Sequence, residues 1–177
     1  MHTRCARGFA LFEVLVAVLV LAVGVLGGAA AQLASLRTRH ASALLSNGVQ
    51  LAASLAERMR ANPAQLHAPD AANPYLQLHY SADDGAPPEP APCFAAGACP
   101  SVQLAAFDLA ETVQLLQRDF PGGRIRVCRD DSATLSWDCS GAPTAPIVVK
   151  LGWLRRQPDG SWAATPALVM VVEGASP

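Results

Sequence analysis

Residues 9–31 form an apolar run in which Glu13 is the only charged side chain. As a helix with a rise of about 1.5 Å per residue, the run would be roughly 34 Å long, enough to cross a hydrocarbon core of about 30 Å. Arg4 and Arg7 precede the run, and basic residues favour the cytoplasmic side of a membrane. The run therefore predicts a membrane-spanning helix with a cytoplasmic N-terminus and an exported domain after it.

Two common export signals fit this run poorly. A secretory signal has an apolar core of about 7–15 residues and a small-residue cleavage site, whereas this run is longer and nothing after it clearly marks a cut. A lipoprotein signal needs its cysteine after the apolar core, whereas Cys5 lies before it.

Glu13 is the exceptional residue of the run. A carboxylate at the centre of a membrane helix costs about 2.5–3.5 kcal/mol, so such residues usually have a partner and a function. Alternatively, Glu13 lies near the start of the span, where it can be solvated at the depth of the lipid headgroups. The spacing alone leaves both interpretations open.

The segment "GFALFEVLVAVLVL" closely resembles the start of type IV prepilins and type II secretion pseudopilins. Their usual motif is a glycine, a phenylalanine, three mostly apolar residues and a glutamate, matched here by Gly8, Phe9 and Glu13. The resemblance implies that a membrane peptidase cuts after Gly8 and methylates the new amine of Phe9. Ala10 and Phe12 depart mildly from the commonest form, but neither changes the glycine, the phenylalanine or the acid.

Cleavage would also create a charge. The free amine of Phe9 would be a cation at neutral pH, and Glu13 lies four residues further along the same helix. A carboxylate at this spacing is a natural counterion, either within one subunit or between neighbouring subunits. We therefore expect Phe9 and Glu13 to form an assembly charge pair.

Beyond residue 31 the sequence becomes amphipathic. Apolar side chains recur at helical spacings, while polar side chains occupy other faces, so one helix is predicted over residues 9–61. Asn62-Pro63 ends it, because a residue before proline is driven out of the helical region. We accordingly divide the chain into a leader peptide (1–8), a transmembrane and assembly half-helix (9–31), an amphipathic half-helix (32–61) and a periplasmic head (62–177).

The head is predicted to be an α+β domain. Residues 64–100 are rich in proline, alanine, glycine and aspartate, which favours loops, and a second helix is predicted over residues 104–119. Four strand-like runs follow at 124–129, 134–139, 147–154 and 167–173, and their short connections favour an antiparallel meander. A long helix packed on a sheet of about four strands is the expected pilin fold.

Three later segments, "ERMRANP", "FDLAETVQLLQRDFPGGRIRVC" and "LSWDC", resemble the PilV group of minor pilins, the type IV pilus modification proteins. The resemblance implies a minor pilin in the bacterial inner membrane that enters the extracellular pilus. The implied partners are other minor pilins, the major pilin, the prepilin peptidase/methyltransferase and the inner-membrane assembly platform. A minor pseudopilin of type II secretion is the alternative, and a membrane-anchored periplasmic enzyme or binding protein is a weaker one.

Four cysteines follow the apolar run: Cys93, Cys99, Cys128 and Cys139. An even set beyond a membrane segment is typical of an oxidising compartment, where disulfides persist. Four cysteines allow three connectivities, so the sequence alone leaves the pairing open. Proximity and the family resemblance favour Cys93 with Cys99 and Cys128 with Cys139.

The second pair constrains the chain between its cysteines. A tight hairpin turn at Asp130-Asp131 would not place Cys128 opposite Cys139, because their midpoint falls between Ala133 and Thr134. This pairing therefore needs a wider or asymmetric turn, and otherwise the cysteines pair differently.

Other chemistry is not indicated. The cysteine gaps differ from the spacing of zinc ligand pairs, and neither a nucleophile elbow nor a phosphate-binding loop is present, so we expect no metal, cofactor or enzymatic activity. A net charge of -1 and a pI near 6.4 give no basic footprint for nucleic acid. Trp137, Trp153 and Trp162 are expected in the core or on a sheet face; exposed together, they would form a binding surface.

Overall fold

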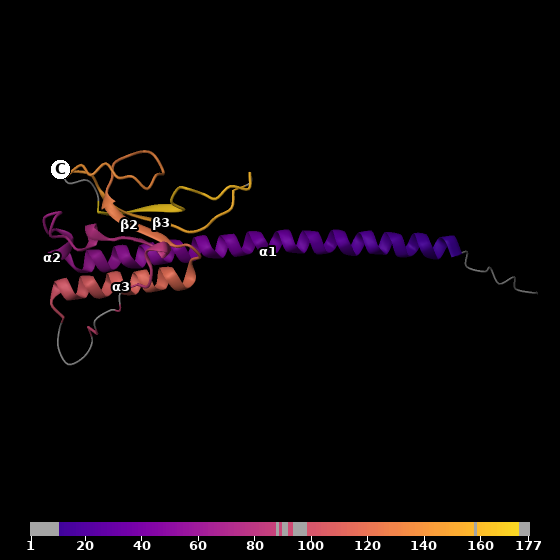
Figure 1. Ribbon diagram of the computed structural model, residues 1–177, viewed down its shortest axis with the longest axis horizontal. Coiled ribbons are helices and arrows are strands. Elements are labelled where there is room, and N and C mark those ends of the chain that lie inside the picture. Colours follow the sequence, from indigo (N-terminus) through magenta and orange to yellow (C-terminus); the bar gives the residue numbers. More distant parts are fainter. Residues whose placement is uncertain (1–10, 88, 90–91, 94–98, 158, 174–177) are drawn as a thin grey trace, which may run out of the picture. The chain divides into compact units, whose positions relative to one another are not determined.

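The computed structural model in Figure 1 describes residues 11–87, 89, 92–93, 99–157 and 159–173. The chain divides into two compact units, Met1–Ala43 and Leu44–Pro177. Helix α1 runs without a break over Leu11–Ala61, as predicted for the described part of residues 9–61. Its residues belong to both units. Gly8 and Phe9, the expected cleavage residues, lie outside the described residues.

Helix α1 ends at the proline identified in the sequence. Asn62 precedes Pro63 and has φ −119° and ψ 65°, outside the helical region, as a residue before proline prefers. The side chain of Asn62 donates from Nδ2 to the carbonyl oxygen of Ser101 at 2.7 Å, so the break also holds the start of a later helix. A short helix, α2 (Pro63–Leu66), follows directly.

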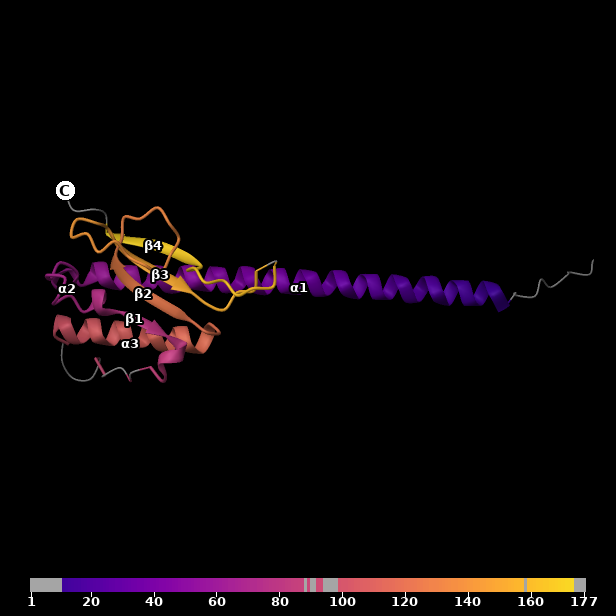
Figure 2. The same cartoon turned by 45° about the horizontal axis from the view of Figure 1, so that its top comes forward.

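The second unit, which we call the head, contains a four-stranded antiparallel sheet in the order β1-β2-β3-β4. The sheet is antiparallel with four strands, as predicted, but one of its strands, β1, is not a predicted one, and α3 lies between β1 and β2 in the chain. With the long helix it gives the predicted α+β pilin fold (Figure 2). Its remaining elements are η1 (Tyr75–Gln77), β1 (His79–Ser81), η2 (Ala82–Asp84), α3 (Ser101–Asp119), β2 (Arg124–Arg129), β3 (Ile147–Gly152) and β4 (Leu168–Glu173).

The core of the head lies between one face of the sheet and the two long helices. Ile125, Val149 and Leu151 from the central strands are fully buried in one cluster with Met59 of α1 and Leu116 of α3. Each such side chain contributes about 1.5–3 kcal/mol when it leaves water. We call this side of the sheet its inner face; because side chains alternate along a strand, Arg126 and its cross-strand partner Lys150 belong to the outer face.

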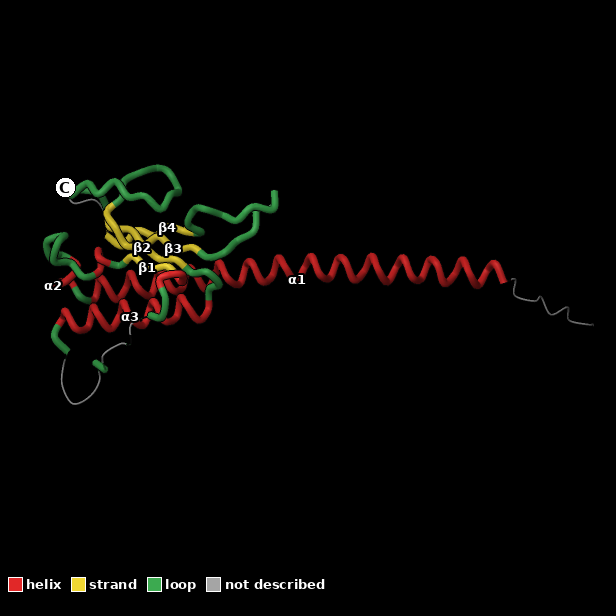
Figure 3. The backbone as a smooth tube through the Cα atoms, in the orientation of Figure 1, coloured by secondary structure: helices red, strands yellow, loops and turns green. Residues whose placement is uncertain are grey.

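The prediction of a strand over residues 134–139 is wrong. This segment belongs to the connection between β2 and β3, residues 130–146, which is a loop without strand pairing (Figure 3). The carbonyl oxygens of Ser136 and Asp138 accept hydrogen bonds from the Lys150 side chain rather than from a neighbouring strand. The alternating pattern of the segment therefore reflects a loop packed on the sheet.

The strand β1 replaces the incorrectly predicted one. It lies within residues 64–100, where only loops were expected, and its three residues pair with β2, with Tyr80 opposite Ile125. Helix α3 begins at Ser101, directly after Pro100, rather than at residue 104 as predicted. Three residues are too few to show the alternation of apolar and polar side chains that identifies a strand in a sequence. The proline-rich residues around β1 therefore favoured the prediction of a loop.

Gly48 permits a close approach of α1 to Leu151 of β3 and to Trp153, which follows this strand. A Cβ atom built on Gly48 would lie 2.8 Å from Cζ3 of Trp153 and 3.2 Å from Cδ2 of Leu151. Gly28, on the same helix, has no such neighbour within 4 Å. The glycine at position 48 therefore allows the Trp153 ring to lie directly on the helix.

We predict that Gly48→Val destabilises the head by about 1–3 kcal/mol, because the added methyl groups overlap the buried Trp153 ring. Urea unfolding of the full chain in detergent, followed by tryptophan fluorescence, measures this change. Gly28→Val is the matched control, and it should leave the unfolding midpoint of the head unchanged. Equal midpoints for Gly48→Val and the unmodified chain would contradict the close-packing argument.

Candidate functional site

The first unit presents an unusually apolar helical surface. Its part of α1 exposes large hydrophobic side chains all along its length, with Phe12 76% and Leu26 71% accessible. Helix α1 is long and apolar enough to cross a membrane by length and composition. Exposed apolar surface of this extent marks a site that contacts lipid or other proteins.

Glu13 lies in the first turn of α1 and is exposed within the first unit. A carboxylate at this position is favoured by the N-terminal end of the helix dipole. Phe9, its expected partner, lies outside the described residues, so the charge pair and the cleavage after Gly8 stay predictions. Among the structurally described residues of this unit, Glu13 is the one acidic side chain.

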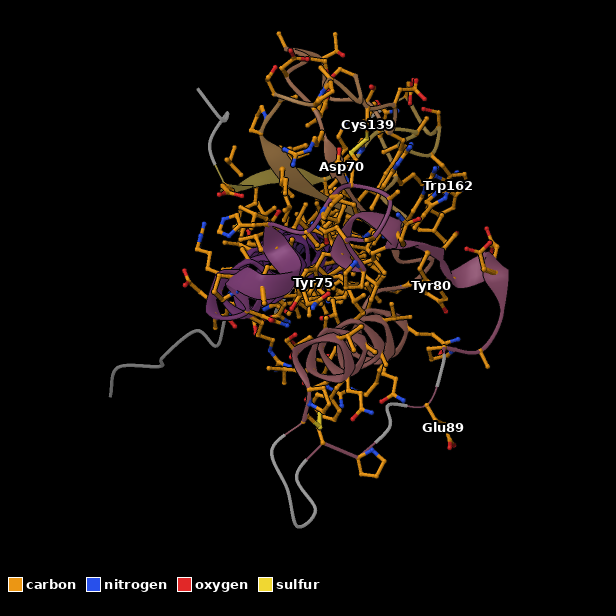
Figure 4. The ribbon with its side chains drawn as sticks, turned by 90° about the vertical axis from the view of Figure 1, so that its left-hand side faces the viewer. Asp70, Tyr75, Tyr80, Glu89, Cys139 and Trp162 are labelled. Atoms are coloured by element: carbon orange, nitrogen blue, oxygen red, sulfur yellow. A yellow bond between two sulfur atoms is a disulfide. The ribbon has the colours of Figure 1, made fainter. Side chains whose placement is uncertain are left out.

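A polar network joins α1 to α3 inside the head. Nη1 of Arg58 donates to Oδ1 of Asp108 at 3.2 Å and also to the carboxylate of Glu111. The hydroxyl of Tyr75 lies 3.5 Å from Oδ2 of Asp108 and accepts a hydrogen bond from Nδ2 of Asn62 at 3.2 Å. Figure 4 shows Tyr75 in the midst of the packed side chains. This network fixes the end of α1 against α3.

Burial governs the protonation of this network. Burial raises the pKa of Asp108, and the hydrogen bond from Arg58 offsets only part of the effect. Burial likewise raises the pKa of Tyr75 to about 12, so its phenol stays neutral in the physiological range. With its groups bonded to one another, the network links α1, α3 and the segment around Tyr75.

Two disulfides constrain the head. The structure joins Cys93 to Cys99 shortly before α3, and it joins Cys128 at the end of β2 to Cys139 in the β2–β3 loop. These are the pairs that the family resemblance favours. The wide connection of residues 130–146 supplies the asymmetric turn that the second pair requires, because it folds back on itself before β3 begins.

Lys150 holds the β2–β3 loop on the outer face of the sheet. Its side chain is 0% exposed, and Nζ lies 2.5 Å from Oδ2 of Asp130. The same Nζ donates to the carbonyl oxygen of Ser136 at 2.9 Å and to that of Asp138. All three acceptors belong to the loop, so this buried ammonium organises its backbone. The sequence reasoning missed Lys150, although a single lysine in the apolar strand "IVVKLG" is a detectable signal.

Trp137 reinforces the same contact. Its carbonyl oxygen accepts a hydrogen bond from Nη1 of Arg126 at 2.9 Å, and the guanidinium of Arg124 lies 4.3 Å from its ring centroid. A Cβ atom on Gly152 would lie 2.9 Å from this ring, so the tryptophan packs closely on β3. The loop is therefore attached by a disulfide, an ion pair, hydrogen bonds and a cation–π contact.

The three tryptophans have different environments. Trp153 is buried as expected and lies with its ring centroid 5.2 Å from that of Phe120. Trp137 is half-buried on the outer face of the sheet. Trp162 differs from the expectation of a core or sheet-face position, because it is 58% exposed in the connection between β3 and β4.

No metal centre is evident in the described part of the chain, where no three His, Cys, Asp or Glu side chains are grouped to hold an ion. The candidate functional surfaces are the exposed apolar half of α1, which carries Glu13, and the solvent-exposed surface of the head.

We predict that Asp130→Asn destabilises the head by about 3 kcal/mol at neutral pH, because it leaves the buried Lys150 ammonium without its counterion. Asp138→Asn is the matched control, since Asp138 contributes its backbone carbonyl to Lys150 and its exposed side chain is dispensable. Urea unfolding of both variants tests this. A neutral Asp130→Asn variant would contradict the organising role of the pair.

The same pair predicts a pH dependence. Burial alone would raise the pKa of Asp130, but the hydrogen bonds from Lys150 and Ser132 outweigh burial and lower the pKa to about 2. Because the pKa is lower in the folded than in the unfolded chain, the stabilisation is present above about pH 4 and is lost as the pH falls toward 2, with a loss of about 2 kcal/mol. The stability difference between the unmodified chain and Asp130→Asn should therefore narrow by that amount between pH 5 and pH 2.

Comparisons with known proteins agree with this arrangement. Residues 30–110 match a family model described as Type IV pilin Tt1218, and residues 3–29 match the prokaryotic N-terminal methylation motif. Neither model describes an enzyme. The chain matched none of the curated proteins and none of the solved structures with which it was compared. On a chain with this long apolar helix, four-stranded sheet and two disulfides, the two family matches together support a type IV pilin.

Proposed function

We propose that this chain is a minor pilin of the PilV group, which contributes to the assembly or priming of a type IV pilus. The observation that carries the proposal is the continuous helix α1, whose exposed apolar half has Glu13 in its first turn and whose other half is built into the head. An apolar helix attached to a compact head can pack with neighbouring helices in a fibre while the head faces outward. The match to the methylation motif supports the general expectation that a prepilin peptidase processes the chain.

The division of the chain follows from this role. Residues 1–8 are the leader, 9–31 the membrane and assembly half of the helix, 32–61 its amphipathic half, and 62–177 the head. Before assembly, the chain crosses the inner membrane once and its head lies in the periplasm. The partners are the prepilin peptidase/methyltransferase, the assembly platform, other minor pilins and the major pilin.

Glu13 has a specific part in the proposal. In a fibre without water around the helices, an unpaired carboxylate is costly, and the methylated amine of Phe9 is an equally costly cation. Pairing Glu13 with the amine of a neighbouring subunit neutralises both charges only when two helices are in register. The pair therefore sets the axial position of an incoming subunit.

The first test is the mature N-terminus. Mass spectrometry of the chain isolated from a cell with a functional pilus system should show a protein that starts at Phe9 and carries one methyl group. Replacement of Gly8 by a large residue should preserve the leader. A mature chain of unmodified sequence that still starts at Met1 would contradict the proposal and favour an uncleaved membrane anchor.

The second test is incorporation. Glu13→Gln should reduce the amount of the chain in sheared, purified pili several-fold while its N-terminal mass stays that of the processed form, because register is lost after processing. Glu89→Gln, a change in the head, is the matched control and should leave incorporation unchanged. If Glu13→Gln enters pili as efficiently as the unmodified chain, the proposed pairing is wrong.

Purified fibres also separate the minor pilin from its rival. A minor pilin should co-purify with pilus components in a small ratio to the major pilin. Co-purification with type II secretion components instead would identify a minor pseudopilin.

A further inference from the structure

The connection between β3 and β4 contains a small β-hairpin. Arg156 and Trp162 form an isolated antiparallel bridge. Two backbone hydrogen bonds flank the bridge, from Gln157 N to Ser161 O at 2.8 Å and from Ala163 N to Arg155 O at 2.8 Å. The bridge is therefore a non-hydrogen-bonded pair, the position at which cross-strand side chains lie closest.

The tip of the hairpin is held by its own residues. Gly160 adopts φ 85°, which a turn of this kind requires, and its N–H donates to the carbonyl oxygen of Gln157 at 2.9 Å. Oδ1 of Asp159 accepts hydrogen bonds from the backbone N–H and the hydroxyl of Ser161. The carboxylate of Asp159 is thus engaged within the turn, and these contacts shape the tip of the hairpin.

One face of this hairpin is exposed. Because side chains alternate along a strand and cross-strand partners share a face, Leu154, Arg156, Trp162 and Ala164 lie on one side, and all four are exposed. Leu154 is 53% and Trp162 58% accessible. We call these four residues the hairpin face. Arg155, on the other side, is directed inward and donates from Nη2 to the carbonyl oxygen of Pro166 at 3.2 Å.

The composition of the hairpin face fits a lipid surface. The Arg156 guanidinium lies 5.8 Å from the centroid of the Trp162 ring, so a cation and an indole are presented together. Tryptophan prefers the interface between hydrocarbon and headgroups, and arginine binds phosphate oxygens through several N–H donors. Nε of Arg156 donates to Gly160 O, which fixes the guanidinium on the hairpin.

The hairpin also starts at the end of the head where α1 enters it. Trp153, which directly precedes the hairpin face, lies on Gly48 near the start of the head, and Leu154 donates its backbone N–H to the carbonyl oxygen of Pro121. Figure 4 shows Trp162 at the margin of the packed side chains. The head is joined along the chain to a helix that is long and apolar enough to span a membrane, so a bilayer that holds this helix keeps a lipid surface at high effective concentration around the head.

We infer that the hairpin face of Leu154, Arg156, Trp162 and Ala164 docks on an anionic phospholipid surface while the subunit is held in the membrane before assembly. Trp162 and Leu154 enter the interfacial layer, and Arg156 binds a lipid phosphate. The contact restrains the head at the membrane, and it must be released when the subunit leaves the bilayer for a fibre. This inference rests on the proposed function only in requiring that α1 anchors the chain in a bilayer.

Tryptophan quenching by brominated lipids tests the contact. The full chain is reconstituted into vesicles of phosphatidylcholine and phosphatidylglycerol whose acyl chains are brominated near the headgroup, and its emission is compared with that in unbrominated vesicles. The unmodified chain should lose emission corresponding to one of its three tryptophans. Trp162→Phe should remove this loss, whereas Trp137→Phe, the matched control, should retain it.

Arg156→Gln separates the electrostatic part. In this variant, and in the unmodified chain in vesicles of brominated phosphatidylcholine alone, quenching should weaken. Emission from Trp162 that is equal in brominated and unbrominated vesicles would overturn the inference. Photocrosslinking from position 162 to a second copy of the chain, without lipid quenching, would also overturn it and would assign the hairpin face to a subunit contact.

Failure of this inference and failure of the proposed function are distinguishable. A mature chain that starts at methylated Phe9 and enters pili, but shows no quenching of Trp162, would retain the pilin role and exclude the lipid contact. Quenching of Trp162 in a chain that retains its leader would support the lipid contact and contradict the pilin role.

Discussion

The head depends on the packing of the last part of α1 against the inner face of the sheet. Leu51, Leu55 and Met59 recur at helical spacing and fill the same cluster as the inward side chains of β2 and β3. Each of these buried side chains contributes about 1.5–3 kcal/mol, so without the helix the sheet loses several kcal/mol of its stability. The apolar side chains of α1 that belong to the first unit are exposed, so lipid or other helices would have to supply their burial.

Both faces of the sheet are covered, but by different physical means. The inner face is apolar and is covered by helices, whereas the outer face carries Arg124, Arg126 and Lys150, which a purely apolar cover could not accommodate. The β2–β3 loop supplies carbonyl oxygens, a carboxylate and an indole ring at the positions of these cations. The disulfide of Cys128 and Cys139 closes the loop over them and limits how far it can open.

The long-range pattern of the sequence predicted the helices and the class of fold. The helical periodicity of residues 32–61 and the proline after Asn62 defined the end of α1, and three of the four expected strands are β2, β3 and β4. The error at residues 134–139 has a physical cause. Apolar and polar residues alternate in a strand, and they can alternate in the same way in an extended loop. In this loop the backbone carbonyl oxygens accept hydrogen bonds from the side chains of Arg126 and Lys150, which lie outside the segment and which a local pattern does not reveal.

The candidate sites also differ in how far the sequence alone could reveal them. Glu13 stands out in the sequence because its surroundings are uniformly apolar, and the motif around it is local. Lys150 can be detected as a single lysine in an apolar strand, but its pairing with Asp130 arises only when β3 is paired with β2 and the loop returns across the sheet. The hairpin around Trp162 was not predicted for a related reason, since a two-residue bridge gives no periodic signal and a core or sheet-face position was expected for this tryptophan.

Two charges in apolar surroundings show how the chain is organised. Lys150 is fully buried, and the head supplies its counterion and two carbonyl oxygens, so this charge is compensated within the chain. Glu13 lies on a helix whose described neighbours in the first unit include no acid or base before Arg37, so its compensation must come from the N-terminal amine, from another molecule or from water. Transfer of that half-helix into a water-poor environment is therefore favourable only where a cation is provided. A head that compensates its buried Lys150 internally, joined to a helix whose Glu13 needs a partner from elsewhere, is a chain whose position in an assembly is selected through the helix.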